Sequence, residues 1–408
     1  MESDLETTQQ DNASPYGEYS FENVFSFKHL CEAALLCKRN VFWKASVQNF
    51  MRAMHYNCAT IYIAFLNGLF RFQDTNEFDI RERGKERHIK SIKIRDRVVQ
   101  KVLCVFCLLP LFSKSFIYDN CASVKDKGIS FAFERLTTML HKYFQKNGNI
   151  GYVLRFDFSD YFGSISHKKA IEMIATKVKD ERVLKIIKDA ISIYSNGEDR
   201  GVGLGSELSQ FIALLYANEI DHLIKDKLRF KYYIRYMDDG VIICESKEQL
   251  KELLKEIQKV CEKLELKLNK KKTTIVPLSR GFNFLKKNII LTDRGRIIMK
   301  ISSDTVTRMR RKLIKLKTKL DEGIVTMRNI EDAYTSWRSF VQQFDAYDTI
   351  QNMDAIFKEI YGYIPKSKKE KSKSRKRSNE IRFEHILEQY EEFEEYIDLV
   401  EDFLLDEE

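Results

Sequence analysis

The chain has 408 residues, of which 44% are hydrophobic, and only 4 Pro and 16 Gly, which excludes a protein dominated by disordered segments. The net charge of +9 combines −12 for residues 380–408 with +21 for residues 1–379, and so basic a body favours a polyanionic partner such as nucleic acid. No apolar run approaches the roughly 20 residues of a membrane helix. Residues 1–19 lack a secretory pattern, and the scattered cysteines favour a reducing cytoplasm.

The N-terminal part combines helices with one β-hairpin. After a polar leader over residues 1–20, apolar residues at helical spacing predict helices over residues 21–75. Residues 78–97 alternate in character, which predicts a basic hairpin that turns at Gly84-Lys85. Further helices are expected through about residue 111 and over residues 130–145.

The central part alternates strands with helices. An apolar run predicts a strand over residues 151–158, and an Asp-Gly pair between two apolar runs predicts a hairpin over residues 232–244. Helices are expected over residues 167–193, 209–227 and 247–264, and short strands near residues 274–276, 282–285 and 296–300.

The C-terminal part changes character twice. Helical spacing is expected over residues 305–363, and residues 366–377 form a low-complexity basic linker. Residues 380–408 carry 13 acidic residues and an apolar stripe at steps of four and three, made of Ile386, Tyr390, Phe393, Ile397, Val400 and Leu404. Three interpretations remain open: docking on the protein's own basic surface, pairing with another copy or a partner helix, and occupation of the nucleic-acid cleft as an anionic mimic.

Aspartates follow two of the predicted strands. Asp157 ends the strand over residues 151–158, and Asp238 and Asp239 lie at the tip of the later hairpin. Three carboxylates brought together by adjacent strands repel one another unless cations neutralise them. Mg²⁺ prefers oxygen ligands and associates with substrate phosphates, and two such ions can activate a hydroxyl and stabilise a leaving pyrophosphate. In isolation, however, Met-Asp-Asp-Gly is equally typical of an ordinary hairpin turn.

Five ordered motifs make the chain resemble the reverse-transcriptase family over roughly residues 81–363. They are Phe156-Asp157-Phe158-Ser159-Asp160-Tyr161-Phe162, Gly203-Leu204-Gly205-Ser206-Glu207-Leu208-Ser209-Gln210, Tyr236-Met237-Asp238-Asp239, Leu268-Asn269-Lys270-Lys271-Lys272-Thr273 and Phe282-Asn283-Phe284-Leu285. Two positions depart from the family pattern: Leu204-Gly205-Ser206 stands where Pro-Gln-Gly is common, and Lys286 stands where Gly is usual.

The resemblance implies an α+β right-hand polymerase fold, with fingers, a palm whose antiparallel sheet carries the Tyr-Met-Asp-Asp hairpin, and a helical thumb. The expected divisions are a leader (1–20), N-terminal helices and fingers (21–150), palm (151–300), thumb (301–364), basic linker (365–379) and acidic amphipathic helix (380–408).

The resemblance also assigns roles near the metal ions. Asp157 and Asp238 would bind two Mg²⁺, for which Mn²⁺ could substitute, with Asp239 as a supporting acid and the Phe158 carbonyl as a further ligand. Lys272 would protonate the pyrophosphate or bind its charge. Phe162 would exclude a ribose 2′-hydroxyl and select deoxynucleotides, although it could also be a core aromatic.

Other residues would handle nucleotide and nucleic acid. Lys85, Arg87 and Arg95 of the basic hairpin would bind the incoming triphosphate, and Gly205 and Gln210 would contact the nucleotide. Ser206 and the basic residues Arg308, Arg311 and Lys315 would contact the template and primer.

The resemblance to stand-alone prokaryotic enzymes suggests a phage-defence enzyme that copies a dedicated non-coding RNA into DNA from deoxynucleotides. Other readings are a diversity-generating, retron or intron-type enzyme, untemplated or protein-primed synthesis, and a catalytically idle nucleic-acid scaffold. A homo-oligomer or partner protein could form through the acidic segment, and no membrane partner is expected.

Overall fold

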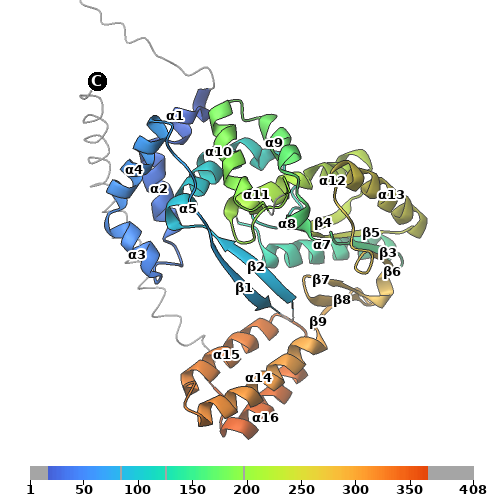
Figure 1. Ribbon diagram of the computed structural model, residues 1–408. Coiled ribbons are helices and arrows are strands. Elements are labelled where there is room, and N and C mark those ends of the chain that lie inside the picture. Colours follow the sequence, from blue (N-terminus) through green and yellow to red (C-terminus); the bar gives the residue numbers. More distant parts are fainter. Residues whose placement is uncertain (1–16, 83–84, 125, 196–197, 366–408) are drawn as a thin grey trace, which may run out of the picture. The chain divides into compact units, whose positions relative to one another are not determined.

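The computed structural model describes residues 17–82, 85–124, 126–195 and 198–365 (Figure 1). The basic linker, the acidic segment and most of the leader therefore lie outside the described residues. The chain divides into two compact units, each assembled from three separate segments. Unit 1 comprises Met1–Phe133, Arg155–Ile242 and Glu248–Thr274, and unit 2 comprises Glu134–Leu154, Ile243–Lys247 and Ile275–Glu408.

Unit 1 begins with the predicted helices, and serine side chains start the first two of them. The helices are α1 (Phe21–Val24), α2 (Phe27–Cys37), α3 (Ala45–Arg52) and α4 (Met54–Leu66). The hydroxyls of Ser20 and Ser26 cap α1 and α2 by accepting backbone N–H groups. In α2, Phe27, Leu30 and Ala34 are buried at the spacing of one helix face.

The basic hairpin is shorter than the sequence predicted. Strands β1 (Asn76–Glu82) and β2 (Lys85–Ser91) pair in antiparallel register, whereas α5 (Ile94–Val102) already begins at Ile94. The extension of the hairpin to residue 97 was therefore wrong. Val98, Val99 and Val102 are buried on α5, so helical packing prevails over the alternating pattern.

The helix after the hairpin is more apolar than the sequence analysis allowed. The stretch Ile94–Ser115 is long and apolar enough, by length and composition, to cross a membrane, which corrects the expectation that no run approaches that length. It comprises α5, the π-helical segment η2 (Leu103–Leu108), α6 (Leu109–Phe112) and a short 3₁₀ turn. Half of its most apolar window is buried, and α5 packs against α2, as in the core helix of a globular unit.

Among the other helices of unit 1, the one expected over residues 247–264 is confirmed by α13, whereas the expected ranges 167–193 and 209–227 are each divided into shorter segments. These helices are α8 (Tyr161–Ser164), α9 (His167–Ala175), α10 (Glu181–Ser192), α11 (Glu207–Tyr216), α12 (Asn218–His222), the π-helical η4 (Leu223–Lys227) and α13 (Lys247–Lys263). The range expected to be helical over residues 167–193 is interrupted between α9 and α10, where Asp180 caps a new helix by accepting the backbone N–H of Arg182.

A four-stranded sheet carries the aspartates. Its order is β4 (Tyr232–Tyr236), β5 (Asp239–Cys244), β3 (Tyr152–Phe156) and β6 (Thr274–Pro277). The predicted strand and hairpin are both present, and only Met237 and Asp238 lie between β4 and β5. Because β5 and β3 are neighbours, the hairpin tip lies beside the end of the strand that precedes Asp157.

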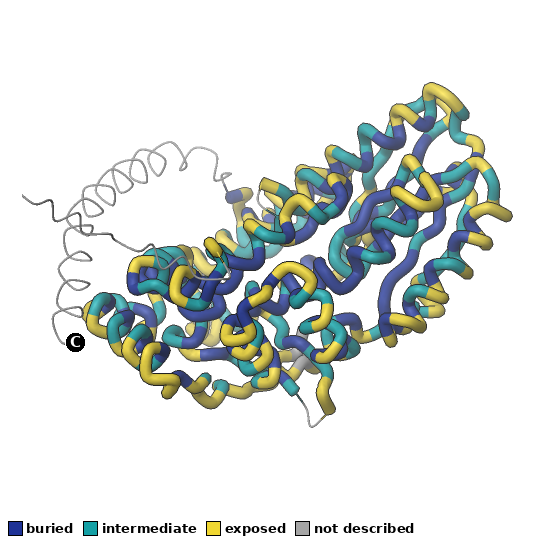
Figure 2. The backbone as a smooth tube through the Cα atoms, turned by 90° about the horizontal axis from the view of Figure 1, so that it is seen from above, coloured by how far each residue is buried: buried dark blue, intermediate teal, exposed yellow. Residues whose placement is uncertain are grey.

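Unit 2 contains a second sheet and three long helices. The sheet order is β7 (Phe282–Phe284), β8 (Lys287–Leu291) and β9 (Ile297–Ile301), and β8 was not predicted. Helices α14 (Ser303–Asp321), α15 (Met327–Val341) and α16 (Tyr347–Tyr361) share a core of Met309, Leu313, Ile330, Tyr334, Met353 and Phe357. Helix α7 (Ile129–Asn147) covers the range expected for it. Figure 2 shows buried and exposed positions alternating along the helices, as amphipathic packing requires.

Candidate active site

Asp157 is held at the end of β3 by backbone pairing with a distant loop. Val153, Leu154 and Phe156 are buried, and Asp157 itself is only 3% exposed. The Asp157 carbonyl accepts the N–H of Asn269 at 2.8 Å, and the Phe158 backbone bridges Leu268. The Leu-Asn-x-x-Lys-Thr motif is thereby fixed against the first aspartate motif.

The same loop delivers Lys272 to that carboxylate. The Asn269 carbonyl accepts the N–H groups of Lys272 and Thr273, which closes a turn. The Lys272 Nζ then donates to Asp157 Oδ2 at 2.6 Å. Burial alone would lower the pKa of Lys272, but the hydrogen bond and charge of Asp157 raise it overall. Lys272 is therefore a cation beside the carboxylate, and its contact with pyrophosphate stays a prediction.

A buried ion pair supports the hairpin tip. Arg235 of β4 is fully buried and pairs with Asp221 of α12, with Nη2 2.6 Å from Oδ2. Its Nη1 also donates to the Met237 carbonyl at 2.8 Å. Met237 has a φ of 53°, an uncommon value outside glycine. The guanidinium therefore fixes a strained turn whose next residue is Asp238.

The three aspartates act on one another electrostatically. Burial, and then the charge of Asp157, raise the pKa of Asp238. Burial and the charges of Asp238 and Asp157 raise the pKa of Asp239 to about 7, although Lys272 and Arg155 oppose this rise. Such mutual destabilisation of carboxylates is what a bound cation would relieve.

Divalent cations suit these carboxylates chemically. The buried Oδ1 of Asp157 accepts no hydrogen bond from the described residues, so it has an acceptor position to offer. Over the same residues, no three His, Cys, Asp or Glu side chains already converge as a metal-binding group. Lys272 holds the other oxygen of Asp157. The residues thus fit a cation, and binding would require the carboxylates to adjust.

A cavity of about 580 Å³ opens in front of the carboxylates. Asp157, Asp238 and Lys272 line it, together with Phe162. The Phe162 ring is half-buried and packs edge-on against Tyr161, with centroids 5.9 Å apart, while the Phe162 carbonyl accepts the N–H of Val202. The ring is therefore held in the cavity wall, where a nucleotide sugar could meet it.

Asp239 and Phe158 occupy different places around this cavity. Phe158 lines it, with its ring stacked on Tyr161 at 4.9 Å between centroids. Asp239 opens β5 and does not line the cavity, although it is coupled to Asp157 and Asp238. Its role as a supporting acid stays a prediction.

Within the Gly-rich loop, Gly203 and Leu204 line this cavity. A Cβ at Gly203 would lie 2.1 Å from the Tyr194 ring, which also lines the cavity. Gly205 and Ser206 instead line an adjoining cavity of about 360 Å³. The Ser206 hydroxyl is buried, donates to Gln100 Oε1 at 2.6 Å and caps α11. Its contact with nucleic acid stays a prediction.

Two predicted nucleotide contacts lie away from the carboxylate cavity. Gln210 is on α11, where its Oε1 accepts the Ser123 hydroxyl at 2.7 Å. Arg95 is on α5 rather than on the hairpin, and it donates to the Arg71 carbonyl and stacks 4.5 Å from the Phe70 ring centroid. Neither residue lines the cavity in this structure.

Strand β2 nevertheless faces this cavity. Glu86, His88 and Lys90 line it, at the alternating spacing of one strand face. The carboxylates of Asp79 and Glu77 accept hydrogen bonds from the His88 ring, which raises the pKa of His88. The side chains of Lys85 and Arg87 fall outside the described part of the structure, so their contact with triphosphate stays a prediction.

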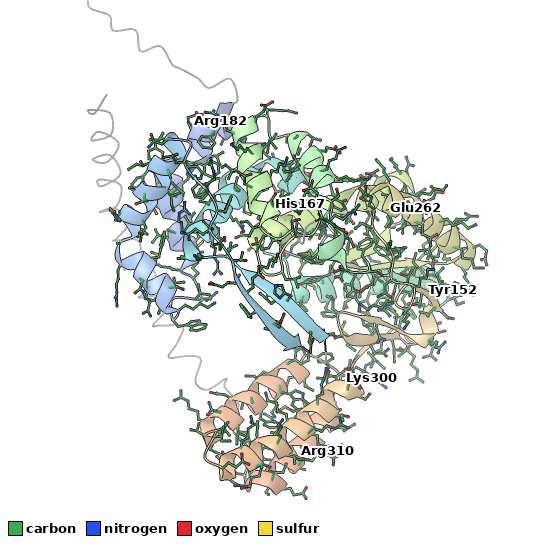
Figure 3. All side chains as sticks on the ribbon, viewed as in Figure 1. Tyr152, His167, Arg182, Glu262, Lys300 and Arg310 are labelled. Atoms are coloured by element: carbon green, nitrogen blue, oxygen red, sulfur yellow. The ribbon has the colours of Figure 1, made fainter. Side chains whose placement is uncertain are left out.

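In unit 2, helix α14 presents the predicted basic residues on its surface. Arg308, Arg311 and Lys315 are exposed at steps of three and four, whereas Met309 and Leu313 are buried against α15 and α16. Figure 3 labels Arg310 on the same helix. This basic face has the charge and spacing suited to a phosphate backbone.

Sequence reasoning missed two arginines. Arg155 lies two residues before Asp157 on β3, and the charges of Asp239 and Asp157 counteract the fall in its pKa that burial causes. Arg235 was missed as the support of the hairpin tip. Each arginine interrupts an apolar strand, and that interruption was the available signal.

A match to a known protein family identifies the family to which this chain belongs. The model of the family "Reverse transcriptase (RNA-dependent DNA polymerase)" matches residues 76–289, just over half of the chain. The chain belongs to the reverse-transcriptase family. The resemblance and the α+β right-hand polymerase fold are thereby confirmed, and the matched range contains Asp157, Asp238, Asp239 and Lys272.

Individual relatives of this reverse transcriptase are distant. Protein YkfC of Escherichia coli (strain K12) is 22% identical over 246 residues, which cover 51% of this chain and 64% of YkfC. Among solved structures, apo telomerase from Candida tropicalis aligns over 76% of this chain and 64% of its own, with a TM-score of 0.47 and 14% identity. Telomerase from Candida albicans with a fragment of telomeric RNA has a TM-score of 0.44 and 12% identity, over 71% and 62% of the two chains.

Proposed function

We propose that the chain is an RNA-directed DNA polymerase that adds deoxynucleotides to a 3′-hydroxyl with two Mg²⁺. One observation carries the proposal: Asp157, Asp238, Lys272 and Phe162 line a single cavity of about 580 Å³. Carboxylates for cations, a lysine for phosphate and an aromatic wall for the sugar are the groups that this chemistry requires.

Each side chain has a distinct task in this proposal. Asp157 and Asp238 would hold the cations, which supply activation of the hydroxyl and neutralisation of the pyrophosphate. Lys272 is already protonated beside Asp157, so it can move to the departing pyrophosphate and donate a hydrogen bond or a proton. Phe162 would stand against the 2′ position of the sugar and favour deoxynucleotides.

Primer extension tests the proposal. Purified protein with a primed RNA template, Mg²⁺ and deoxynucleotides should extend the primer, and Asp238→Asn with Asp239→Asn should reduce the rate at least about 100-fold. Asp293→Asn, at an exposed position of unit 2, is the matched control. Equal activity of the double variant and the wild type would show an idle scaffold instead. Synthesis without a template would show the untemplated mode.

We also propose, at a finer level, a prokaryotic cytoplasmic enzyme that copies a dedicated non-coding RNA in defence against phage. The support is the resemblance of the Gly-Ser-Glu-Leu-Ser-Gln loop and the Tyr-Met-Asp-Asp-Gly tip to defence-associated and diversity-generating enzymes. Sequencing of the RNA that co-purifies with the protein, and of the DNA made from it, is the test. One abundant RNA species with matching DNA is expected, together with phage protection that Asp238→Asn abolishes. A random RNA population without protection would contradict the role.

A further inference from the structure

A second cavity of unit 1, with a volume of about 360 Å³, adjoins the carboxylate cavity and is basic. Both cavities are lined by Lys90, Tyr194 and Leu204, so they lie side by side along this wall. Among the described residues, the charged side chains that line the second cavity are Arg39, Lys90, Arg97, Lys101 and Glu207. Glu207 is already paired with Lys101. We call this space the basic cavity.

The cations of the basic cavity leave positive charge to offer to a ligand. Lys90 of β2 donates to the Ser195 carbonyl at 3.2 Å and lies 4.0 Å from Glu77. Arg39, in the turn after α2, is exposed. The four cations exceed Glu207 and Glu77 by a charge of +2. Positive charge beside a site that handles phosphates favours the backbone of a nucleic-acid strand.

The turn between α2 and α3 forms one rim of the basic cavity and exposes two aromatic rings (Figure 1). Val41 lines the cavity together with Arg39, and Phe42 and Trp43 follow directly in the sequence. The two aromatic side chains are 52% and 74% exposed, and the Lys44 Nζ stands 5.4 Å from the Trp43 ring centroid. Both rings are anchored within about 8 Å of the Val41 Cα, because consecutive Cα atoms are about 3.8 Å apart. We call Phe42 and Trp43 the aromatic rim.

Exposed rings interleaved with cations are typical of surfaces that bind unpaired nucleotides. Every base has a face that can stack on an aromatic ring, while Lys and Arg neutralise the phosphates between the bases. Residues 38–44 contain three cations and the two rings, and no Asp or Glu occurs between Glu32 and Asp74. The rim therefore suits a single strand of nucleic acid, without preference for its sequence.

We propose that unpaired template nucleotides ahead of the carboxylates run along the basic cavity and stack on Phe42 and Trp43. The proposal rests on the proposed function, because it assigns a path to the part of the strand that the polymerase has yet to copy. Phosphates of this strand would meet Lys90 and Arg39, and its bases would stack on the aromatic rim. Stacking would hold the uncopied strand extended and away from the carboxylate cavity.

Templates that differ only in the length of the overhang test this path. Primed RNA templates carry a 5′ overhang of one to about 12 unpaired nucleotides, and the affinity of the wild type should rise about tenfold or more and then level off. Trp43→Ala with Phe42→Ala should lose most of this gain. Trp43→Phe with Phe42→Tyr keeps both rings and should retain it. An affinity that is independent of overhang length in the wild type, or an undiminished gain in the double Ala variant, would overturn the proposal.

Two controls separate this contact from other effects. Tyr347→Ala, at a 75% exposed aromatic position of unit 2, should keep the gain, and an equal loss in this variant would overturn the proposal. Extension of the one-nucleotide overhang by the wild type reports the proposed function by itself. Absence of that extension would overturn both proposals, whereas extension without a gain from longer overhangs would overturn only the contact with the aromatic rim.

Photo-cross-linking of the wild-type protein supplies a second arm that depends on no variant. 5-Iodouridine is placed at one overhang position at a time, and the linked residue is identified by mass spectrometry. A narrow run of positions should link to Phe42 or Trp43, and iodouridine in the primer strand should not. Links only to other regions, or equal links from the primer strand, would overturn the proposed path.

Discussion

At the scale of single residues, Asp239 links metal binding to stability. Its pKa of about 7 in the folded protein exceeds the usual value near 4 in an unfolded chain. The folded state therefore holds a proton that the unfolded state releases, so stability falls as the pH rises from about 4 to above 7 without divalent cations. A bound cation would remove this penalty.

Asp239→Asn should therefore stabilise the metal-free protein at pH 8 by on the order of 2 kcal/mol, with the gain vanishing near pH 4. Urea unfolding in EDTA at the two pH values measures this difference. Asp293→Asn, at an exposed position, should show no such pH dependence. A gain of the same size at both pH values would show that repulsion among the aspartates is not the cause.

Phe162 should determine the choice of sugar. Phe162→Ala removes the ring from the cavity wall, so discrimination between deoxynucleotides and ribonucleotides should fall about 10- to 100-fold. The ratio of kcat/KM for the two nucleotide classes measures it. Phe162→Tyr keeps a ring of similar size and should retain the discrimination. Unchanged discrimination in Phe162→Ala would assign the ring to the core alone.

At the scale of elements, the buried Arg235–Asp221 pair should position Asp238 through the Met237 carbonyl. Asp221→Asn leaves a buried charge without its partner and should cost about 3–5 kcal/mol. Tyr233 also donates to Asp221, so all three residues are replaced together by Arg235→Met, Asp221→Leu and Tyr233→Phe. This triple variant should recover most of the stability, yet its primer extension should remain at least about tenfold slower than that of the wild type. Denaturant unfolding and primer extension separate the two effects. Full recovery of the rate would mean that the pair serves stability alone.

The turn between β7 and β8 carries strain that one substitution should relieve. Leu285 and Lys286 have φ values of 46° and 67°, as the two central positions of a tight hairpin turn require. Lys286→Gly should stabilise the protein by about 1 kcal/mol, because glycine adopts such values without strain. Thermal unfolding by circular dichroism measures the shift. Lys300→Gly, inside β9, should instead destabilise it, and a shift of the same sign in both would contradict the explanation.

Elements with a strong local signal could be predicted from the sequence, whereas those decided by distant partners could not. The strand before Asp157 and the Tyr-Met-Asp-Asp hairpin follow from apolar runs and motifs that need no knowledge of contacts. By contrast, β8 begins with Lys287 and Asn288, polar residues whose strand pairing to β7 and β9 appears only in the folded unit. Arg95 looked like part of a strand, and its place on α5 depends on packing.

At the scale of the whole molecule, positive charge on residues 1–379 should dominate nucleic-acid affinity. The exposed residues Arg308, Arg311 and Lys315 lie on one face of α14, where each could neutralise one phosphate. The plot of log affinity against log salt concentration has a negative slope, to which each phosphate contact contributes roughly −0.9. Replacement of the three residues by Gln should therefore make this slope shallower by about 2–3 for a primed duplex. Binding measured from low to moderate salt gives this slope.

A matched set of lysines shows whether position matters beyond charge. Lys251, Lys255 and Lys259 are also exposed along one face of a helix, α13, and their replacement by Gln removes the same total charge. If α14 contacts the duplex backbone, the salt dependence of the affinity should become shallower only in the α14 variant. The α13 variant should lose a little affinity through the long-range electrostatic field. Equal slopes in the two variants would mean that net charge, rather than a thumb surface, attracts the nucleic acid.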